Sequence, residues 1–288
     1  MQTGAVSARQ TARDAARRLR ESGVPEPLVS AEVLLSELLD VRRGDLAFLK
    51  EPLSPEQAER YGAWIERRIR REPVQRILGY SYFRNLTLDL DESTLIPRPD
   101  TESVVDAALE VIDAHREPPI VLDIGTGSGA IAIAIAQERP ACEVHATDIS
   151  EGALEVARRN ARNNGTTVEF YRADVAAGLD KLRGRVGMLV SNPPYVGRED
   201  EDRLAPEVRE WDPHAALFSE GGALQFYRRI FAEASGLLTP GAEVVLEVGD
   251  AQADAVLELG GRSGFIPLGS RPDLTGTPRA VLLRRKLV

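Results

Sequence analysis

The sequence predicts an α/β fold in which a doubly wound, mostly parallel, seven-stranded sheet follows a small all-α region. From residue 118 onward, short apolar runs rich in β-branched residues alternate with longer runs of helical period. Such alternation is typical of parallel sheets with helices on both faces. A glycine-rich turn follows the first short run, where sheets of this kind bind nucleotide-like ligands.

Length and composition limit what the chain can be. With 288 residues, 43% of them hydrophobic and 28% charged, it can fold into one large and one small domain. No apolar run approaches the roughly 18 residues of a membrane helix. The single cysteine, Cys142, excludes an internal disulfide, and the histidines at 115, 145 and 214 lack the spacing of a metal site. We therefore expect a cytoplasmic monomer without a metal and without membrane contact.

The charge is unevenly distributed. Residues 1–85 carry 15 Lys and Arg against 12 Asp and Glu, a net +3, whereas the remaining residues carry 21 against 33, a net −12. Proteins that hold duplex nucleic acid through phosphate contacts need a broad basic surface. The distribution therefore argues against a nucleic-acid substrate.

Residues 1–72 are expected to form a helical bundle that recognises the substrate. Helices are predicted at residues 7–21 and 27–39 from the spacing of their apolar side chains. A third helix begins after Ser54, which together with Gln57 has the sequence of a capping box. Four arginines lie around its end: Arg67, Arg68, Arg70 and Arg71. They are interpreted either as a solvated helix terminus or as a docking patch for an acidic or RNA-bound partner.

Residues 73–100 are expected to connect the bundle to the sheet. Alternation of leucine with polar residues from 86 to 90 predicts a β-hairpin. In the following LIPRPDTE segment, residues 95–102, two prolines flank Arg98 and stiffen the chain. The segment is interpreted either as a plain linker or as a lid over the later site, with Arg98 as a substrate-binding residue.

Residues 101–288 are expected to form the sheet domain, whose first helix begins at Thr101. Strands are predicted at residues 120–122, 142–147, 168–171, 188–190, 242–248, 265–268 and 280–283, and further helices at 130–137, 150–163 and 224–237. Only a short segment rich in Gly, Pro and Asp separates the last two strands. They are therefore expected to form an antiparallel pair.

The turn after the first strand reads Asp123-Ile124-Gly125-Thr126-Gly127-Ser128-Gly129. Glycines let the backbone approach a ligand closely, but the second half of the dinucleotide fingerprint, whose helix start receives a pyrophosphate, is missing. The carboxylate of Asp123 stands where it can hold an ammonium group, directly or through water. A ligand with a positive amino-acid end and no phosphates fits the turn, and S-adenosylmethionine is that ligand.

Acidic residues also follow the second and third strands. Asp148 ends the second strand, about 20 residues beyond the turn, where a carboxylate can accept hydrogen bonds from both ribose hydroxyls. Asp174 and Val175 follow the third strand, where a polar acceptor and an apolar side chain can flank the adenine. Asp148 is alternatively a residue of the helix cap that follows, and Asp174 an ordinary turn residue.

The segment Ser191-Asn192-Pro193-Pro194-Tyr195 leaves the fourth strand. Its prolines fix the backbone and remove two N–H donors, which leaves the side-chain oxygen of Asn192 and the main-chain carbonyls of Asn192 and Pro193 as acceptors. A planar NH2 group suits these acceptors, and Tyr195 offers a ring to lie against it. Residues 192–195 are called the acceptor ledge below.

The two halves of the site predict methyl transfer to a weakly nucleophilic amine. The lone pair of an amide or aryl amine is delocalised, and accepting hydrogen bonds from both N–H groups returns electron density to the nitrogen. Transfer then needs mainly positioning and electrostatics. Asn192 is expected to orient and polarise the amine, and no strong general base is needed because the proton can leave after transfer.

The motifs LIPRPDTE, DIGTGSG and SNPPY resemble those of the protein-(glutamine-N5) methyltransferases that modify bacterial peptide chain release factors. The similarity continues through residues 72–79, 212–213, 216–218 and 226–229 and covers nearly the whole chain. It implies a Rossmann-like, S-adenosylmethionine-dependent methyltransferase fold. The implied substrate is the glutamine of a Gly-Gly-Gln loop in release factors one and two. By resemblance, residues 125–129, Asp148 and Asn192 contact the cofactor, and the acceptor ledge grips the glutamine amide.

Alternatives remain open at this point. The NPPY motif is shared with enzymes that methylate exocyclic amines of adenine in DNA or guanine in RNA, but such an enzyme needs a target-recognition domain or a basic groove, and neither is evident. A nicotinamide oxidoreductase would leave the acceptor ledge unused. A sensor that binds S-adenosylmethionine or release factor without catalysis would not need the complete ledge.

Overall fold

The computed structural model describes residues 7–219 and 221–287, which divide into two compact units. The first unit contains the described residues up to Gly79 together with Ala205–Trp211. The second contains Tyr80–Leu204 and the described residues from Asp212 onward. The first unit thus extends beyond the predicted boundary at residue 72, and it takes in a short segment from much later in the sequence.

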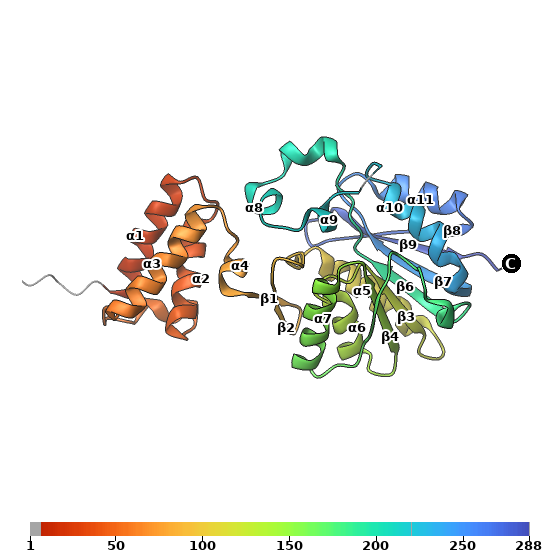
Figure 1. Ribbon diagram of the computed structural model, residues 1–288, viewed down its shortest axis with the longest axis horizontal. Coiled ribbons are helices and arrows are strands. Elements are labelled where there is room, and N and C mark those ends of the chain that lie inside the picture. Colours follow the sequence, from red (N-terminus) through yellow and green to blue (C-terminus); the bar gives the residue numbers. More distant parts are fainter. Residues whose placement is uncertain (1–6, 220, 288) are drawn as a thin grey trace, which may run out of the picture. The chain divides into compact units, whose positions relative to one another are not determined.

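The first unit is helical, as predicted. Its helices are α1 (Ala8–Glu21), α2 (Pro27–Leu39), the 3-10 helix η1 (Arg43–Ala47), α3 (Pro55–Ile69), α4 (Val74–Leu78) and the short α8 (Pro206–Arg209). Alanines on α1 let α2 and α3 pack closely against it around buried leucines and Ile65 (Figure 1). The predicted capping box is present, since Ser54 and Gln57 exchange side-chain and backbone hydrogen bonds of 2.9 and 3.2 Å.

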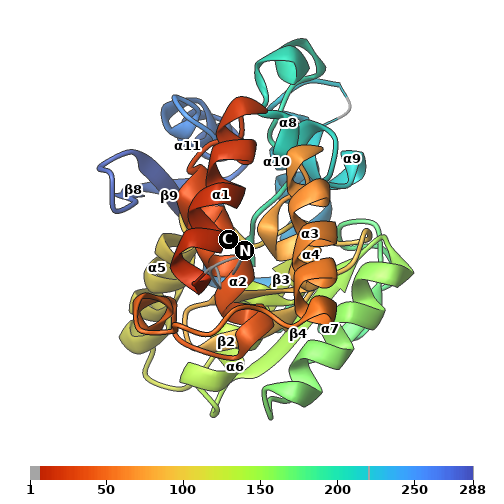
Figure 2. The same ribbon diagram turned by 90° about the vertical axis from the view of Figure 1, so that its left-hand side faces the viewer.

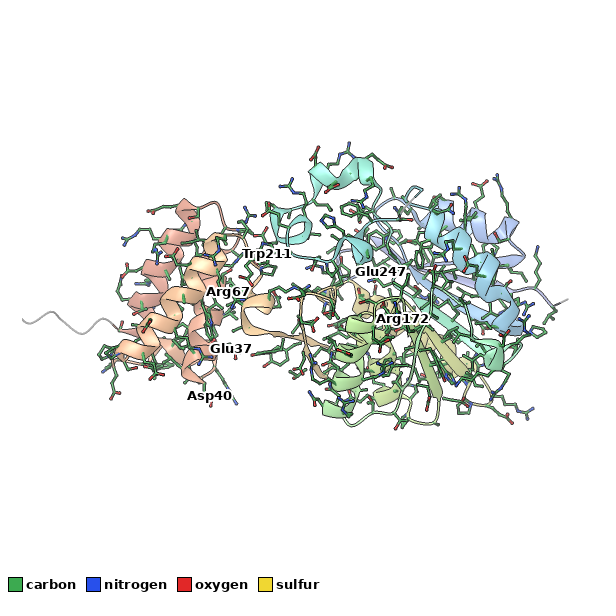
Figure 3. All side chains as sticks on the ribbon, in the orientation of Figure 1. Glu37, Asp40, Arg67, Arg172, Trp211 and Glu247 are labelled. Atoms are coloured by element: carbon green, nitrogen blue, oxygen red, sulfur yellow. The ribbon has the colours of Figure 1, made fainter. Side chains whose placement is uncertain are left out.

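Three of the four arginines at the end of α3 form ion pairs within the first unit, and the interpretation as a solvated helix terminus is wrong for the buried Arg68. Arg67, labelled in Figure 3, donates to Glu72 at 2.8 Å. The buried Arg68 and the neighbouring Arg71 both donate to Glu207 of α8, Arg71 through two bonds of 2.6 and 2.7 Å. Arg68, Arg71 and Glu207 are called the Glu207 latch below. Their charges hold the segment Ala205–Trp211 in the first unit.

The second unit contains the predicted seven-stranded sheet. Its strands are β3 (Ile120–Ile124), β4 (Glu143–Asp148), β5 (Glu169–Arg172), β6 (Val186–Ser191), β7 (Leu238–Glu247), β8 (Phe265–Pro272) and β9 (Pro278–Arg285). They lie in the order β5-β4-β3-β6-β7-β9-β8. Pairs from β5 to β7 are parallel, whereas β9 is antiparallel to both β7 and β8. The prediction of a terminal antiparallel pair is confirmed.

Helices cover both faces of this sheet (Figure 1). One core contains α5 (Thr101–Ala114), α6 (Ala130–Glu138) and α7 (Glu151–Asn163); the other contains α10 (Gln225–Arg229) and α11 (Ala253–Arg262). The single helix predicted at 224–237 is divided, because α10 continues as a π-helix over Ile230–Ala234 and a 3-10 turn over Ser235–Leu237. The wider π turn still directs Ile230 and Phe231 into the same core as Tyr227.

The predicted hairpin forms a separate two-stranded sheet of β1 (Tyr80–Phe83) and β2 (Leu86–Asp89). Its side chains Phe83, Leu86 and Leu88 are buried in the core that contains α6. Asn160 of α7 fixes its end, since the amide bonds to both backbone groups of Asp89 at 2.8 and 3.1 Å and to the carbonyl of Ser128 at 2.9 Å. The hairpin is therefore fastened to the glycine-rich turn.

The sheet order determines where a ligand can bind. The chain runs from β3 outward to β5 and then returns to place β6 on the other side of β3, so the strand order reverses between β3 and β6. In doubly wound sheets the crevice outside the carboxyl ends of such strands is the binding position. Among the described residues, no helix is long and apolar enough to cross a membrane.

Candidate active site

A cavity of about 730 Å³ opens at the carboxyl ends of β3 and β6. Most of the predicted site residues line it: Arg98, Gly125, Thr126, Gly127, Ser128, Asp148, Asp174, Val175, Asn192 and Pro194. Four other predicted site residues, all within the described part of the chain, do not line the cavity: Asp123, Gly129, Pro193 and Tyr195. Figure 2 shows the ribbon turned by 90°, with β3, β4 and the helices α5, α6 and α7 of the second unit labelled. The two motifs that are far apart in sequence thus share one cavity.

The glycines of the turn have two different roles. Gly125, Gly127 and Gly129 all have positive φ, at 73°, 56° and 86°. A Cβ atom on Gly125 or Gly127 would meet no protein atom within 4 Å, so these glycines leave open space into which a ligand can approach the backbone. A Cβ atom on Gly129 would lie 2.7 Å from Ile133, so this glycine is required for packing within α6.

Asp123 lies beneath the turn and has an unused acceptor. Its side chain is fully buried, and Oδ2 accepts a hydrogen bond of 2.6 Å from the Thr126 hydroxyl. Oδ1 has no hydrogen-bond partner among the described residues. Burial raises the pKa of Asp123 to about 7, with a further contribution from the charge of Asp148, whereas the Thr126 hydroxyl and the backbone N–H of Ala132 oppose that rise. A buried carboxylate with a free oxygen suits a cationic or N–H-donating ligand.

Asp148 is oriented by the backbone on either side of it. Oδ2 accepts from the Gly127 N–H and Oδ1 from the Ser150 N–H, both at 2.9 Å. Burial raises the pKa of this carboxyl, and the backbone donors oppose that rise. Since each carboxylate oxygen has two lone pairs, one on each oxygen remains for a ligand hydroxyl.

Asp174 and Val175 line the cavity, as does Arg229, which the sequence did not reveal as a site residue. Asp174 forms an ion pair of 2.9 Å with Arg229, which also lines the cavity. Val175 is buried with φ of 53°, an unfavourable conformation for a β-branched residue that costs about 1–3 kcal/mol. Thr147 holds it by donating a hydrogen bond of 3.3 Å to its carbonyl.

Asn192 is oriented from both sides. Ser191, directly before it, donates to the carbonyl of Ile124 at 2.6 Å and so ties the end of β6 to the end of β3. The Asn192 Nδ2 donates to the Thr101 hydroxyl at 3.2 Å. One N–H of the amide is therefore used by Thr101, and the side-chain oxygen is the acceptor that remains for a ligand.

Tyr195 supports the acceptor ledge without forming the wall of the cavity. Its phenol donates to Oε1 of Glu247 at 3.4 Å, and its carbonyl accepts from the Gln252 side chain at 2.9 Å. Burial raises the pKa of Tyr195 far above its usual value, with the charge of Glu247 acting in the same direction. The predicted ring surface for the amine is thus not part of the cavity wall in this structure.

Arg98 is held by a residue that follows the acceptor ledge in the sequence. Its guanidinium is paired with the carboxylate of Asp212, whose side chain is wholly buried. About one third of the Arg98 side chain remains exposed, and it lines the cavity together with Leu95 and Pro97. The proline-rich bend is therefore part of the cavity wall.

Thr101 and Glu247 were missed as site residues by sequence reasoning. Thr101 was recognised only as the start of a helix, although it is the partner of the Asn192 amide. Glu247 interrupts the otherwise apolar end of β7, and an acidic residue within such a run is a signal that could have identified it. Within the described part of the chain, no group of three or more His, Cys, Asp or Glu is arranged to hold a metal ion.

Two protein-family models match the chain. One is described as the PrmC N-terminal domain and matches residues 10–79; the other is described as the methyltransferase small domain and matches residues 104–225. The first match ends where the first structural unit ends at Gly79. The second spans β3 to β6 and therefore both motifs of the cavity.

Curated relatives match over almost the entire chain. The release factor glutamine methyltransferase of Streptomyces coelicolor is 39% identical over 275 residues, which is 95% of this chain and 96% of the relative. The protein of the same name from Cereibacter sphaeroides is 39% identical over 276 residues, 94% of this chain and 96% of the relative. A crystal structure of a methyltransferase from Pyrococcus furiosus covers 71% of this chain and 91% of its own with a TM-score of 0.52, but at 20% identity it indicates a likeness of fold alone.

Proposed function

The chain belongs to the family of release factor glutamine methyltransferases, and from this membership we propose its reaction and its substrate. The reaction is transfer of a methyl group from S-adenosylmethionine to the side-chain amide nitrogen of the glutamine in the Gly-Gly-Gln motif of peptide chain release factors 1 and 2. One observation supports it above all. The glycine-rich turn and Asn192, whose amide nitrogen donates to Thr101, line one cavity, and the buried Asp123, with one oxygen that lacks a partner among the described residues, directly precedes the turn.

The residues around the glycine-rich turn fit the proposed cofactor. The buried Oδ1 of Asp123, which has no hydrogen-bond partner among the residues that the structure describes, suits its ammonium end, directly or through water. The space above Gly125 and Gly127 admits a ligand to the backbone, and Asp148 keeps a free lone pair on each oxygen for the ribose hydroxyls. When bound, S-adenosylmethionine supplies an electrophilic methyl group on a sulfonium sulfur.

The acceptor ledge performs the chain's own part of the reaction. Asn192 Oδ1 and a main-chain carbonyl of the ledge accept the two N–H groups of the glutamine amide. These bonds hold the amide plane and raise electron density on the nitrogen. Because the orientation of Asn192 is fixed by Thr101, little reorganisation is needed when the substrate enters. The proton leaves the nitrogen after transfer, so the site needs no strong base.

The first unit is proposed to recognise the release factor. None of its described residues lines the cavity, and its sequence matches the family model described as the PrmC N-terminal domain. Since release factors act in translation, the cytoplasm is the proposed location of the reaction.

Methyl transfer from labelled S-adenosylmethionine tests the proposal. The acceptors are purified release factor, the same protein with Gln→Ala in its Gly-Gly-Gln loop, total RNA and duplex DNA. Label on the intact release factor alone is expected. Label on RNA or DNA, with release factor unlabelled, would keep the role of Asn192 but replace the substrate by an exocyclic amine of a nucleobase.

A further inference from the structure

A buried carboxylate lies next to the acceptor ledge on the neighbouring strand. Glu247, labelled in Figure 3, is the last residue of β7, which pairs with β6. Only 1% of its surface is exposed. Its Oε1 accepts from the phenol of Tyr195, whereas its Oε2 has no hydrogen-bond partner among the described residues. Burying a carboxylate is costly, and it is rarely found in such a position unless it serves a partner.

Thr101 connects Glu247 to Asn192. Its hydroxyl accepts from Asn192 Nδ2 at 3.2 Å, and its side chain also acts on the carboxyl of Glu247, where it favours the ionised form and lowers the pKa. A threonine hydroxyl has one hydrogen, and an ionised carboxylate can only accept. When that hydrogen is directed at Glu247, the hydroxyl can only accept from Asn192. The NH2 end of the amide must then face Thr101.

We propose that Glu247 is a positioning residue, which acts through Thr101 to select the orientation of the Asn192 amide that presents Oδ1 to the NH2 group of the substrate. The inference rests on the proposed function, because an NH2-bearing acceptor substrate is what requires an oxygen at this position. In the reverse orientation, Asn192 would present an NH2 group to another NH2 group, and no hydrogen bond could form.

The surroundings of Glu247 make this selection sensitive to pH. Burial raises its pKa to about 7, opposed by Thr101 and by the charge of Arg279 on β9; Asp100 raises it further, and the Tyr195 hydrogen bond lowers it. Tyr227 of α10 donates to the main-chain carbonyl of Glu247 at 2.8 Å and leaves the carboxylate free. A protonated Glu247 would donate a hydrogen bond, so Thr101 could turn its own hydrogen toward Asn192 and reverse the amide.

Two substitutions remove the selection while keeping the side-chain volume. Glu247→Gln removes the charge, and Thr101→Val removes the hydroxyl. Each is expected to lower kcat for release factor by at least about tenfold, because orientation of a reacting group is worth this much or more. Binding of S-adenosylmethionine, measured by calorimetry, should stay close to wild type. Thr101→Ser, which keeps the hydroxyl, should restore most of the turnover.

The pH profile distinguishes positioning from a structural role. In the wild type, kcat should fall below a pH of about 7, and in Glu247→Gln this acidic limb should disappear. Glu243→Gln is the matched control on the same strand; its carboxylate bonds to His115 and Arg284, and it should leave the profile unchanged. Wild-type turnover in Glu247→Gln, or an unchanged acidic limb, would overturn the proposal.

A spectroscopic measurement separates this inference from the proposed reaction. The side-chain amide resonances of Asn192, assigned by their loss in Asn192→Ala, should shift with pH in the wild type, with a midpoint near that of Glu247, and should not do so in Glu247→Gln. Resonances that do not respond to pH would refute the role of Glu247 even in an enzyme that methylates release factor. A wild type that responds in this way but transfers no methyl group to release factor would instead refute the proposed substrate.

Discussion

Asn192 and Asp123 lie at the carboxyl ends of adjacent strands, yet burial affects them differently. The amide of Asn192 is neutral and keeps its partner Thr101 in the absence of a ligand. The carboxylate of Asp123 has one oxygen without a partner among the described residues. A buried charge that lacks a partner is far more costly than a hydrogen-bonded amide. The free energy of the ligand-free site is therefore raised mainly at Asp123, where a cationic ligand would lower it.

Asn192→Ala removes the acceptor oxygen and should lower turnover by about 10²- to 10³-fold, the loss found when one hydrogen-bonding group of a polar catalytic site is removed. The thermal midpoint should stay near that of the wild type, because only a partly buried amide is lost. Single-turnover methylation of release factor together with a thermal melt checks both. Asn163→Ala on α7 is the control, and near-normal turnover of Asn192→Ala would refute the role of the ledge.

The raised pKa of Asp123 predicts how the stability of the ligand-free protein depends on pH. Its value of about 7 in the folded protein lies above the unfolded value of about 3.9, so the folded state binds this proton more tightly. The free energy of unfolding should fall as pH rises from about 4 through 7, and Asp123→Asn should reduce that fall by roughly a few kcal/mol. Glu247 contributes in the same direction, so part of the slope should remain.

Urea denaturation at several pH values measures this slope in the wild type and in Asp123→Asn. The affinity for S-adenosylmethionine should rise over the same range in the wild type, since its ammonium group prefers the ionised carboxylate. The variant should lose that rise. Equal slopes in both proteins would show that Asp123 is ionised at all these pH values.

At the residue scale, local motifs made most of the site predictable. The glycines, Asp148 and Asn192 follow strands directly, and their residue types suffice to identify them. Thr101, Glu247 and Arg229 could not be found in this way. Each comes from a different element and becomes a site residue only through tertiary contacts. The strand order places β7 with Glu247 beside β6, Thr101 of α5 bonds to Asn192, and Arg229 of α10 pairs with Asp174.

At the element scale, the sequence predicts the centres of elements better than their ends. The predicted core of β6 was residues 188–190, but the strand begins at Val186, which pairs with Leu238 at the start of β7. This pairing is a tertiary contact and has no local signal. The helix α3 begins where its capping box predicts, because that signal is contained in four residues. Local physics thus determines elements whose partners are near in sequence.

The Glu207 latch allows a prediction at the same scale. Glu207→Gln leaves the buried Arg68 without a charged partner and should destabilise the first unit by roughly 1–3 kcal/mol. Glu210→Gln is the control, since Glu210 forms an exposed pair with Arg209 that is worth less than about 1 kcal/mol. Chemical denaturation followed by the fluorescence of the tryptophans checks the difference. Equal losses in the two variants would mean that the latch does not stabilise the unit.

At the scale of the whole molecule, the chain cannot be divided at a single point. The segment Ala205–Trp211 belongs to the first unit, whereas the residues before and after it belong to the second. Hydrogen bonds between Val196 and residues Leu217 and Ser219, at 3.2 and 3.0 Å, close the base of this excursion in the second unit. Sequence reasoning placed the boundary at residue 72, before α4, and assigned residues 205–211 to the sheet domain. The second assignment could not be avoided, because contacts between segments so far apart leave no local pattern.

Deletion of residues 1–79 tests the proposed recognition role of the first unit. The remaining chain should bind S-adenosylmethionine, since the residues that line the cavity all belong to the second unit, but it should lose methylation of whole release factor. Calorimetry and the labelled-methyl assay measure the two properties. A second deletion variant with Ala205–Trp211 replaced by glycine and serine separates the loss of recognition from the effect of that segment's exposed side chains. Loss of cofactor binding in both variants would give the first unit a structural role.

The Glu207 latch also has a consequence for the time course of synthesis. Arg68 and its partner Glu207 are 139 residues apart in sequence. At the usual speed of translation, the ribosome needs on the order of 10 s to proceed from one to the other. During that interval the helices around Arg68 can assemble only without its charged partner, with the guanidinium bonded to Ser30 and to the carbonyl of Glu72. Folding of the first unit can therefore start early in translation, but it can finish only after Ala205–Trp211 has been synthesised.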